Sequence, residues 1–211
     1  SADAFDVDAR KGKWGGGYCT GIDEYKLPFI LANFNGSSGD IDVLTHEAGH
    51  AFAYYEAYNS EVDYELGLGT MSVAEIHSMA MEFFAYPWME DFFKEDTKKY
   101  KVYHMSGAIT FIPYGVCVDH FQHLVYANPN ATPAERRQMW SDLEKMYTPW
   151  RNMEGLEAYE QGMLWFQQGH IFSSPFYYID YTLAQVCALE FYLDSLEDKE
   201  DAFNRYLQLC K

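Results

Sequence analysis

The chain has 211 residues, of which 48% are hydrophobic and 22% charged, values that suit a folded domain with a buried core and exclude wholesale disorder. Its formal net charge is −17, so the chain repels phosphate backbones and we expect no nucleic-acid partner. It has no apolar run of the about 18 residues that span a bilayer, no charged-then-apolar leader and no metal-like cysteine spacing, so we expect a cytoplasmic protein with reduced thiols and no membrane partner.

Strand and turn patterns dominate residues 1–40. The run at 27–34 (LPFILANF) predicts a strand, and Pro28 confines that strand to a sheet edge or marks its start. Residues 35–39 (NGSSG) break the run. A helix is then expected from about Asp40 to Tyr58, because acidic residues at its beginning suit the positive end of the helix dipole.

The remaining pattern is helical almost to the end of the chain. A Ser-x-x-Glu sequence at Ser72 and a Thr-Pro-x-Glu sequence at Thr132 each predict the beginning of a helix. The apolar stretch 106–126 contains Pro113, which predicts a kinked or broken buried helix. Further helices are expected at about 152–167, at about 175–196 and after Glu197. We therefore predict a single, mainly α-helical domain, residues 1–211, with a small β element near the N-terminus.

The clearest chemical motif is HEAGH at residues 46–50, which matches HExxH inside a predicted helix. Because four residues make about one helical turn, His46 and His50 project from one face and can converge on one ion. A catalytic zinc needs a further protein ligand, commonly a carboxylate, and an open position for water. Glu75, near the start of the next predicted helix, is the candidate ligand. The alternative is that Glu75 only closes a capping box with Ser72.

Three stretches of the sequence carry a resemblance to a known family. They are Asn33-Phe34 with THEAGHAF at 45–52, then EIHSMAME at 75–82, and finally GHIF at 169–172 with PFYYIDY at 175–181. Together they resemble peptidase family M3, the zinc oligopeptidases, and especially its oligoendopeptidase F branch. The resemblance implies a zincin-like helical catalytic domain that binds one Zn²⁺ per chain through His46, His50 and Glu75.

The same resemblance carries an expectation about the size of the protein. Family members are usually much longer, with a helical N-terminal lobe that closes one side of a substrate channel. We therefore expect this chain to be the catalytic half without that lobe, and to associate with the lobe or with another subunit. An isolated catalytic half would be weakly active because one wall of the channel is open to water.

The resulting hypothesis is a zinc-dependent endopeptidase that cleaves internal bonds of short oligopeptides. Zinc lowers the pKa of a bound water to about 7 and polarises the scissile carbonyl. Glu47 would take the proton of that water as general base and deliver it to the leaving amine. His170, Tyr178 and Tyr181 are the candidate donors to the oxyanion, although tyrosines three residues apart on a helix also pack in ordinary cores.

Two further predictions concern residues around this centre. Glu82 lies seven residues after Glu75 and on the same helical face, so its carboxylate either accepts a hydrogen bond from the outer nitrogen of a ligand imidazole or lies in solvent. The strand that ends at Asn33 and Phe34 is the candidate substrate-binding strand, because main-chain pairing with an extended peptide gives affinity without side-chain specificity.

Two other classes of protein stay open. A carboxylate-bridged di-iron oxidoreductase builds its site from two Glu-x-x-His motifs, and this chain has only the one at Glu47–His50. A non-catalytic peptide-binding module that retains a structural zinc is the other alternative. An intact Glu47 disfavours that module, since a structural site has no use for a free base.

Overall fold

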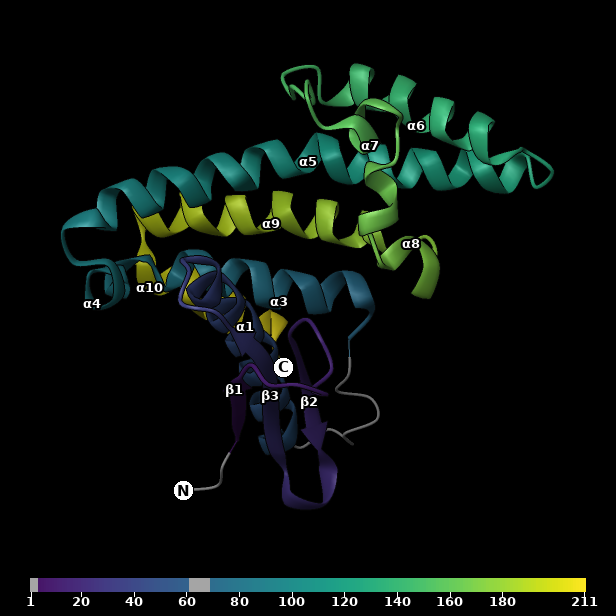
Figure 1. Cartoon of the computed structure of the whole chain (residues 1–211). Helices are drawn as coiled ribbons and strands as arrows, with labels where there is room; N and C mark the ends of the chain where they lie inside the picture. The colour runs from purple at the N-terminus through teal and green to yellow at the C-terminus, as the bar shows by residue number, and fades with distance from the viewer. Residues whose placement is uncertain (1–3, 61–68) are drawn as a thin grey trace. The chain divides into compact units, whose positions relative to one another are not determined.

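The computed structural model describes residues 4–60 and 69–211 (Figure 1). Its strands are β1 (Phe5–Asp8), β2 (Tyr18–Ile22) and β3 (Leu27–Phe34). Its longer helices are α1 (Gly39–Asn59), α3 (Met71–Phe84), α5 (Thr97–Ala127), α6 (Pro133–Tyr147), α9 (Tyr178–Glu197) and α10 (Lys199–Leu209). Short helical segments are α4 (Met89–Phe93), α7 (Glu157–Glu160), α8 (His170–Ser173) and the 3-10 turns Asp23–Tyr25, Tyr86–Trp88, Lys94–Asp96 and Leu164–Gln167. The predicted fold class, mainly α with a small β element near the N-terminus, is confirmed.

The chain forms two compact units. The first contains the residues up to His104 together with Ala184–Lys211, and the second contains Met105–Leu183. The three strands, α1 and α3 all belong to the first unit, whereas α6, α7 and α8 belong to the second. None of the helices in the described part of the chain combines the length and the apolar character that a membrane crossing requires.

The sheet has the strand order β1–β3–β2, so of the two readings of Pro28 the sheet edge is wrong and the start of the strand is confirmed. β3 is the central strand, parallel to β1 and antiparallel to β2. Pro28 is accommodated because it lies at the start of the strand, before the pairing with β1 begins at Ile30. The edge strands of the described sheet are therefore β1 and β2.

Helix α1 covers the predicted range almost residue for residue. The carboxylate of Asp40 in its first turn accepts hydrogen bonds from the backbone N–H groups of Asn35 and Gly36, which closes the preceding turn onto the helix start. Gly49, on the same helix, lies against the backbone of α3: a Cβ at this position would be 2.6 Å from Ser78 Cα. The absence of a side chain at Gly49 therefore allows the two helices to approach closely.

Helix α3 begins one residue earlier than the sequence pattern predicts. Its N-cap is Thr70, so Ser72 lies inside the first turn instead of capping the helix. The capping box that would have given Glu75 a purely structural role is therefore wrong. In the same unit α10 packs on α3, where the Tyr206 hydroxyl donates a hydrogen bond of 2.9 Å to the carbonyl of His77.

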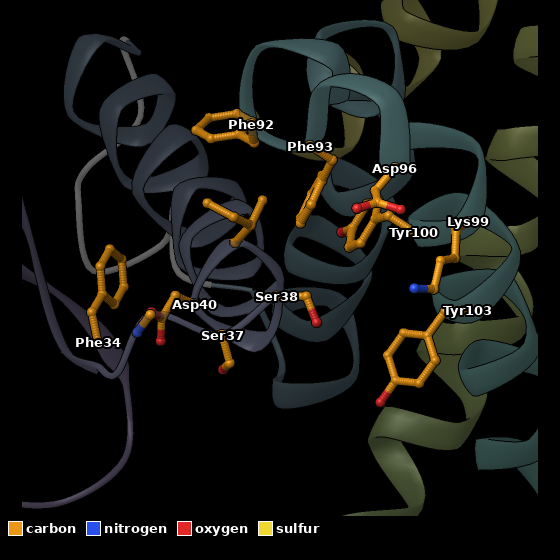
Figure 2. A pocket seen from close by; sticks show the side chains of 12 residues that line it. Phe34, Ser37, Ser38, Asp40, Phe92, Phe93, Asp96, Lys99, Tyr100 and Tyr103 are labelled. Atoms are coloured by element: carbon orange, nitrogen blue, oxygen red, sulfur yellow. The ribbon is translucent and has the colours of Figure 1, made fainter.

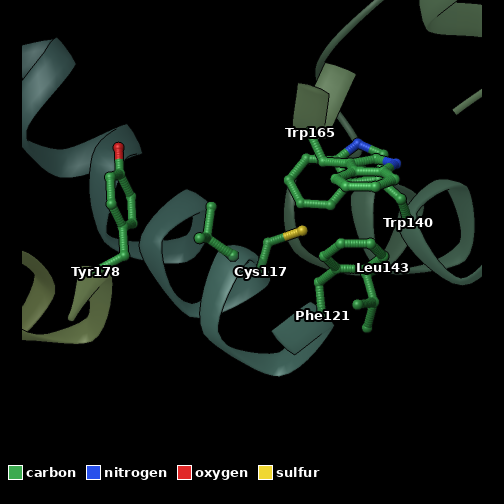
Figure 3. Close-up of a cluster of buried hydrophobic side chains, with 7 residues drawn as sticks. Cys117, Phe121, Trp140, Leu143, Trp165 and Tyr178 are labelled. Carbon is green, nitrogen blue, oxygen red and sulfur yellow. The ribbon is translucent and has the colours of Figure 1, made fainter. Parts of the chain in front are cut away.

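The second unit is built around an aromatic core. Figure 3 shows Phe121, Trp140, Leu143 and Trp165 packed together, with the sulfur of Cys117 pointing toward them. The capping box predicted at Thr132 is present, because the Thr132 hydroxyl and the Glu135 carboxylate each accept a hydrogen bond from the other residue's backbone N–H.

Two helix predictions in the second unit are corrected. The helix expected at 152–167 is interrupted, because Gly155 and Gly162 have φ values of +84° and +71°, which an α-helix does not allow. Of the two readings of the stretch with Pro113, the broken helix is wrong, because α5 is continuous from Thr97 to Ala127, and the kink stays a prediction.

Candidate metal centre

The three predicted metal ligands converge at the contact between α1 and α3. His46 Nε2 lies 3.3 Å from Glu75 Oε2, and His50 Nε2 lies 3.7 Å from the same oxygen. One ligand atom from each of the three residues lies within 4.8 Å of the others. A tetrahedral zinc with ligands at 2.0–2.2 Å holds its ligand atoms about 3.4 Å apart. The donor set and its spacing therefore fit a zinc ion.

Glu82 makes the predicted contact with a ligand histidine. Its Oε1 accepts a hydrogen bond of 2.8 Å from His46 Nδ1. Because Nδ1 is the donor in this bond, Nε2 of the same ring is directed to Glu75 and His50. On the other side of the centre, the buried Ser78 hydroxyl lies 3.0 Å from Glu75 Oε2 and is placed to donate to it.

The pKa values of His46 and His50 are shifted in opposite directions. Burial by itself would lower the pKa of His46, but hydrogen bonds to Glu75 and Glu82 outweigh burial and raise this pKa to about 10. Burial, followed by repulsion from His46, lowers the pKa of His50 to about 4. Without a cation, His46 therefore carries a hydrogen on each ring nitrogen, Nδ1 facing Glu82 and Nε2 facing Glu75. A bound cation would take the place of the Nε2 hydrogen, and its charge would be balanced by the same carboxylates.

Glu47 is buried beside this centre, with 6% of its surface exposed. Burial raises the pKa of its carboxyl to about 7, although attraction to His46 and a hydrogen bond from the backbone N–H of Cys19 act in the opposite direction. Its Oε2 has no hydrogen-bond partner within residues 4–60 and 69–211. A buried carboxylate oxygen without a protein partner suits a site that receives a polar group from solvent or substrate.

Gly17 has no side chain, which allows the backbone just before β2 to lie close to Glu47. A Cβ at Gly17 would lie 2.8 Å from Val43 Cγ1 and 3.4 Å from Glu47 Oε1. The residue leads directly into β2, the strand whose Cys19 N–H bonds to Glu47. The edge strand β2 is consequently the part of the sheet that borders the candidate general base.

Two residues at the centre were missed by the sequence analysis. His104 Nε2 lies 2.8 Å from Glu82 Oε2, and His104 Nδ1 lies 2.8 Å from the Tyr86 hydroxyl. His104 and Tyr86 are both buried, at 8% and 5% exposure. Neither stands at a motif spacing from the HExxH histidines, so only the folded chain brings them to Glu82.

The three predicted substrate-side residues lie together in the second unit. His170 Nε2 is 3.4 Å from the Tyr181 hydroxyl, and the ring of Tyr178 meets the His170 ring edge-on at 5.2 Å. Gln168, also missed from the sequence, has its amide nitrogen 2.8 Å from His170 Nδ1. The Gln168 amide oxygen accepts a hydrogen bond of 3.1 Å from the Tyr114 hydroxyl. His170 is therefore held from both sides.

Asn33 and Phe34, the predicted substrate-binding residues, make different contacts. The Asn33 amide donates hydrogen bonds of 2.9 Å to the backbone carbonyls of Trp14 and Gly16, which ties the glycine turn to β3. Phe34 lines a pocket of about 680 Å³ near the start of α1, and Figure 2 shows it facing Tyr100 and Tyr103 of α5 across that pocket. None of the three metal-ligand candidates lines this pocket. The substrate roles of Asn33 and Phe34 stay predictions.

A helix that carries HExxH, with both histidines converging on a glutamate of the next helix in the structure, is the arrangement that defines HExxH metallopeptidases. The chain belongs to peptidase family M3, whose family model matches residues 4–208.

Several known proteins that resemble the chain carry the names of peptidases. Oligopeptidase PepF of Bacillus subtilis (strain 168) is 24% identical over 213 residues, which cover 98% of this chain and 31% of that protein. The structure described as PZ peptidase A with inhibitor 2 is 56% identical and superposes with a TM-score of 0.93, covering 98% of this chain and 37% of that one. A putative oligoendopeptidase F from Bacillus anthracis str. Ames is 51% identical with a TM-score of 0.83, covering 99% and 34%. The chain thus spans about a third of the length of these relatives.

Proposed function

We propose that this chain is the catalytic part of a zinc metalloendopeptidase that hydrolyses internal peptide bonds of short oligopeptides. The observation that carries the proposal is the convergence of His46, His50 and Glu75 beside the buried carboxylate of Glu47. The names of the relatives, an oligopeptidase and an oligoendopeptidase, support the substrate class. The proposal includes one zinc per chain, one catalytic domain over residues 1–211 and a cytoplasmic location, for which four free thiols give support.

In the proposed mechanism, His46, His50 and Glu75 hold the zinc. When bound, zinc supplies the Lewis acidity that makes water acidic near neutral pH and polarises the scissile carbonyl. Glu47 would accept the proton of the attacking water and then pass it to the leaving amine; its buried carboxylate beside the three ligands supports this role. Glu82 keeps the Nδ1 hydrogen on His46 and so leaves Nε2 for the metal.

His170, Tyr178 and Tyr181 are proposed as the groups that bind the substrate carbonyl and stabilise its oxyanion. Their mutual contacts support this role, because a hydrogen-bonded histidine–tyrosine pair is a preorganised donor. The Gln168 amide, held by Tyr114, fixes the ring of His170 in the pair.

The strand order of the sheet bears on which strand would pair with a substrate peptide. β3 has a neighbour on both sides, so an extended peptide adds more readily to an edge strand than to β3. Of the two edges, β2 borders Glu47 through Cys19, and we assign main-chain pairing to it. Asn33 then acts indirectly by fixing the turn that leads to β2, and Phe34 contributes the apolar wall of its pocket.

The proposal is tested by metal analysis together with cleavage of an internally quenched oligopeptide. We expect about one zinc per chain and slow cleavage by the 211-residue chain, increased by association with an N-terminal lobe of the family or with a second subunit. Glu47→Gln is the matched control, since it keeps the size of the side chain and removes the base. Zinc binding without turnover above that control would favour the non-catalytic binding module, and absence of metal binding would refute both.

A further inference from the structure

We propose that His104 and Tyr86 are positioning residues that raise the zinc affinity of the site by fixing the carboxylate of Glu82. The inference rests on the proposed function, because it concerns the same metal site. Neither residue can touch the metal directly, since His104 directs one ring nitrogen to Glu82 and the other to Tyr86.

The hydrogen-bond directions in this group follow from its chemistry. The Tyr86 hydroxyl has one hydrogen, and His104 Nδ1 is its hydrogen-bond partner in the described part of the chain. A carboxylate oxygen can only accept, so His104 Nε2 carries the hydrogen of its contact with Glu82 Oε2 and donates it. In the tautomer with its hydrogen on Nε2, Nδ1 is an acceptor, and the Tyr86 hydroxyl donates to it.

Glu82 therefore accepts one histidine N–H on each oxygen. His46 Nδ1 occupies Oε1 and His104 Nε2 occupies Oε2, both at 2.8 Å. A carboxylate bonded at both oxygens has a fixed plane, and this plane sets the direction of the His46 ring. If His104 is removed, a buried charged oxygen is left unsatisfied, and Glu82 gains freedom to rotate away from His46.

The surroundings of His104 hold its ring in place. The Phe83 and Tyr86 rings meet it edge-on, with centroids 5.2 and 5.5 Å away, and the Tyr100 ring stacks on it at 5.8 Å. These ring contacts and the burial of His104 limit rotation of its ring away from Glu82. The hydrogen bonds from Tyr86 to His104, from His104 to Glu82 and from His46 to Glu82 thus form one connected series that ends at a proposed metal ligand.

The test is the zinc affinity of the 211-residue chain, measured by competition with a chromophoric chelator. We expect His104→Leu to weaken zinc binding by about 10- to 100-fold, the usual cost of removing a group that orients a metal ligand. His104→Gln should restore much of the affinity, because its amide N–H can still donate to Glu82. The d–d absorption spectrum of the Co²⁺-loaded chain should change in His104→Leu and return toward that of the wild type in His104→Gln.

The matched control is a second, half-buried histidine–tyrosine pair. His120 Nδ1 lies 3.0 Å from the Tyr147 hydroxyl in the second unit, without contact to Glu82, so His120→Leu should leave zinc affinity unchanged. Wild-type affinity in His104→Leu would overturn the inference while leaving the proposed function intact. If that variant does not fold, Tyr86→Phe decides, and unchanged affinity in a folded Tyr86→Phe chain would also overturn it. A wild-type chain that binds no zinc would overturn both proposals.

Discussion

Replacement of Gly49 by alanine should push apart the two helices that carry the metal ligands. A Cβ at this position would lie 2.6 Å from Ser78 Cα and would also meet the carbonyl oxygen of His77. The shortest contact would be 2.4 Å, to the His77 carbonyl oxygen, and ordinary contact begins near 3.4 Å, so α1 and α3 must separate by about 1 Å. Both neighbours are backbone atoms in a helix, which cannot rotate away as the end of a side chain can.

The expected cost of Gly49→Ala has two parts. Overpacking of this kind lowers the free energy of unfolding by about 1–3 kcal/mol. The separation also moves Glu75 away from His46 and His50, whose distances of 3.3 and 3.7 Å to it already match a zinc site. A shift of about 1 Å exceeds the tolerance of about 0.2 Å for metal–ligand distances, so zinc affinity should fall as well.

Urea unfolding of the metal-free chain and zinc competition measure the two parts separately. Gly107→Ala in α5 is the matched control, because no atom lies within 4 Å of a Cβ there, and it should be neutral or stabilising by up to about 1 kcal/mol. Wild-type stability together with wild-type zinc affinity in Gly49→Ala would refute the close-approach argument.

Three more outcomes are expected. Tyr181→Phe should lower kcat by about 10²- to 10³-fold while zinc affinity stays constant, and an unchanged kcat would exclude it as an oxyanion donor. Burial raises the pKa of the Asp42 carboxyl group despite a hydrogen bond from Tyr100, so Asp42 holds its carboxyl proton more tightly in the folded chain than in the unfolded chain. In urea titrations, the wild type should therefore lose stability relative to Asp42→Asn as the pH rises from about 3.8 through the pKa of Asp42 in the folded chain. If the difference in the free energy of unfolding between the two chains did not change up to pH 7, the favourable interaction of the Asp42 carboxylate with the positive end of the α1 dipole would have to offset the cost of burial. Trp140→Ala should reduce the free energy of unfolding by about 3–5 kcal/mol, since Trp140 is fully buried, and a loss below about 1 kcal/mol in calorimetry would contradict its place in the core.

Local signals in the sequence were sufficient for the elements that carry the chemistry. The helix with HExxH begins and ends within a residue of its predicted bounds because acidic residues and the turn before it mark its start. The spacing of His46 and His50 on one helical face is a property of the helix itself, so their convergence follows from the sequence. The cap at Thr132 is equally local and was predicted for the same reason.

The misses depend on long-range contacts or on backbone conformation that composition does not reveal. β3 is central because β1, more than 20 positions earlier, pairs with it, and a proline at the start of the strand does not prevent this. Gly155 and Gly162 interrupt a helical pattern through positive φ values, which composition does not specify. His104 reaches Glu82 only after α3 and α5 pack, so no spacing along the chain could have predicted it.

His46 and His50 lie on α1 and Glu75 lies on α3, and this placement has a consequence for the stability of the protein when the metal is absent. An ion bound by His50 and Glu75 would join residues that are 25 positions apart, and because only the folded chain brings them together, its binding free energy would stabilise that state. Loss of the ion would then remove stability and catalysis in the same event. When the metal is scarce, the metal-free protein should therefore be less stable and should be degraded by proteases, so that it does not accumulate as an inactive form that regains activity when metal returns.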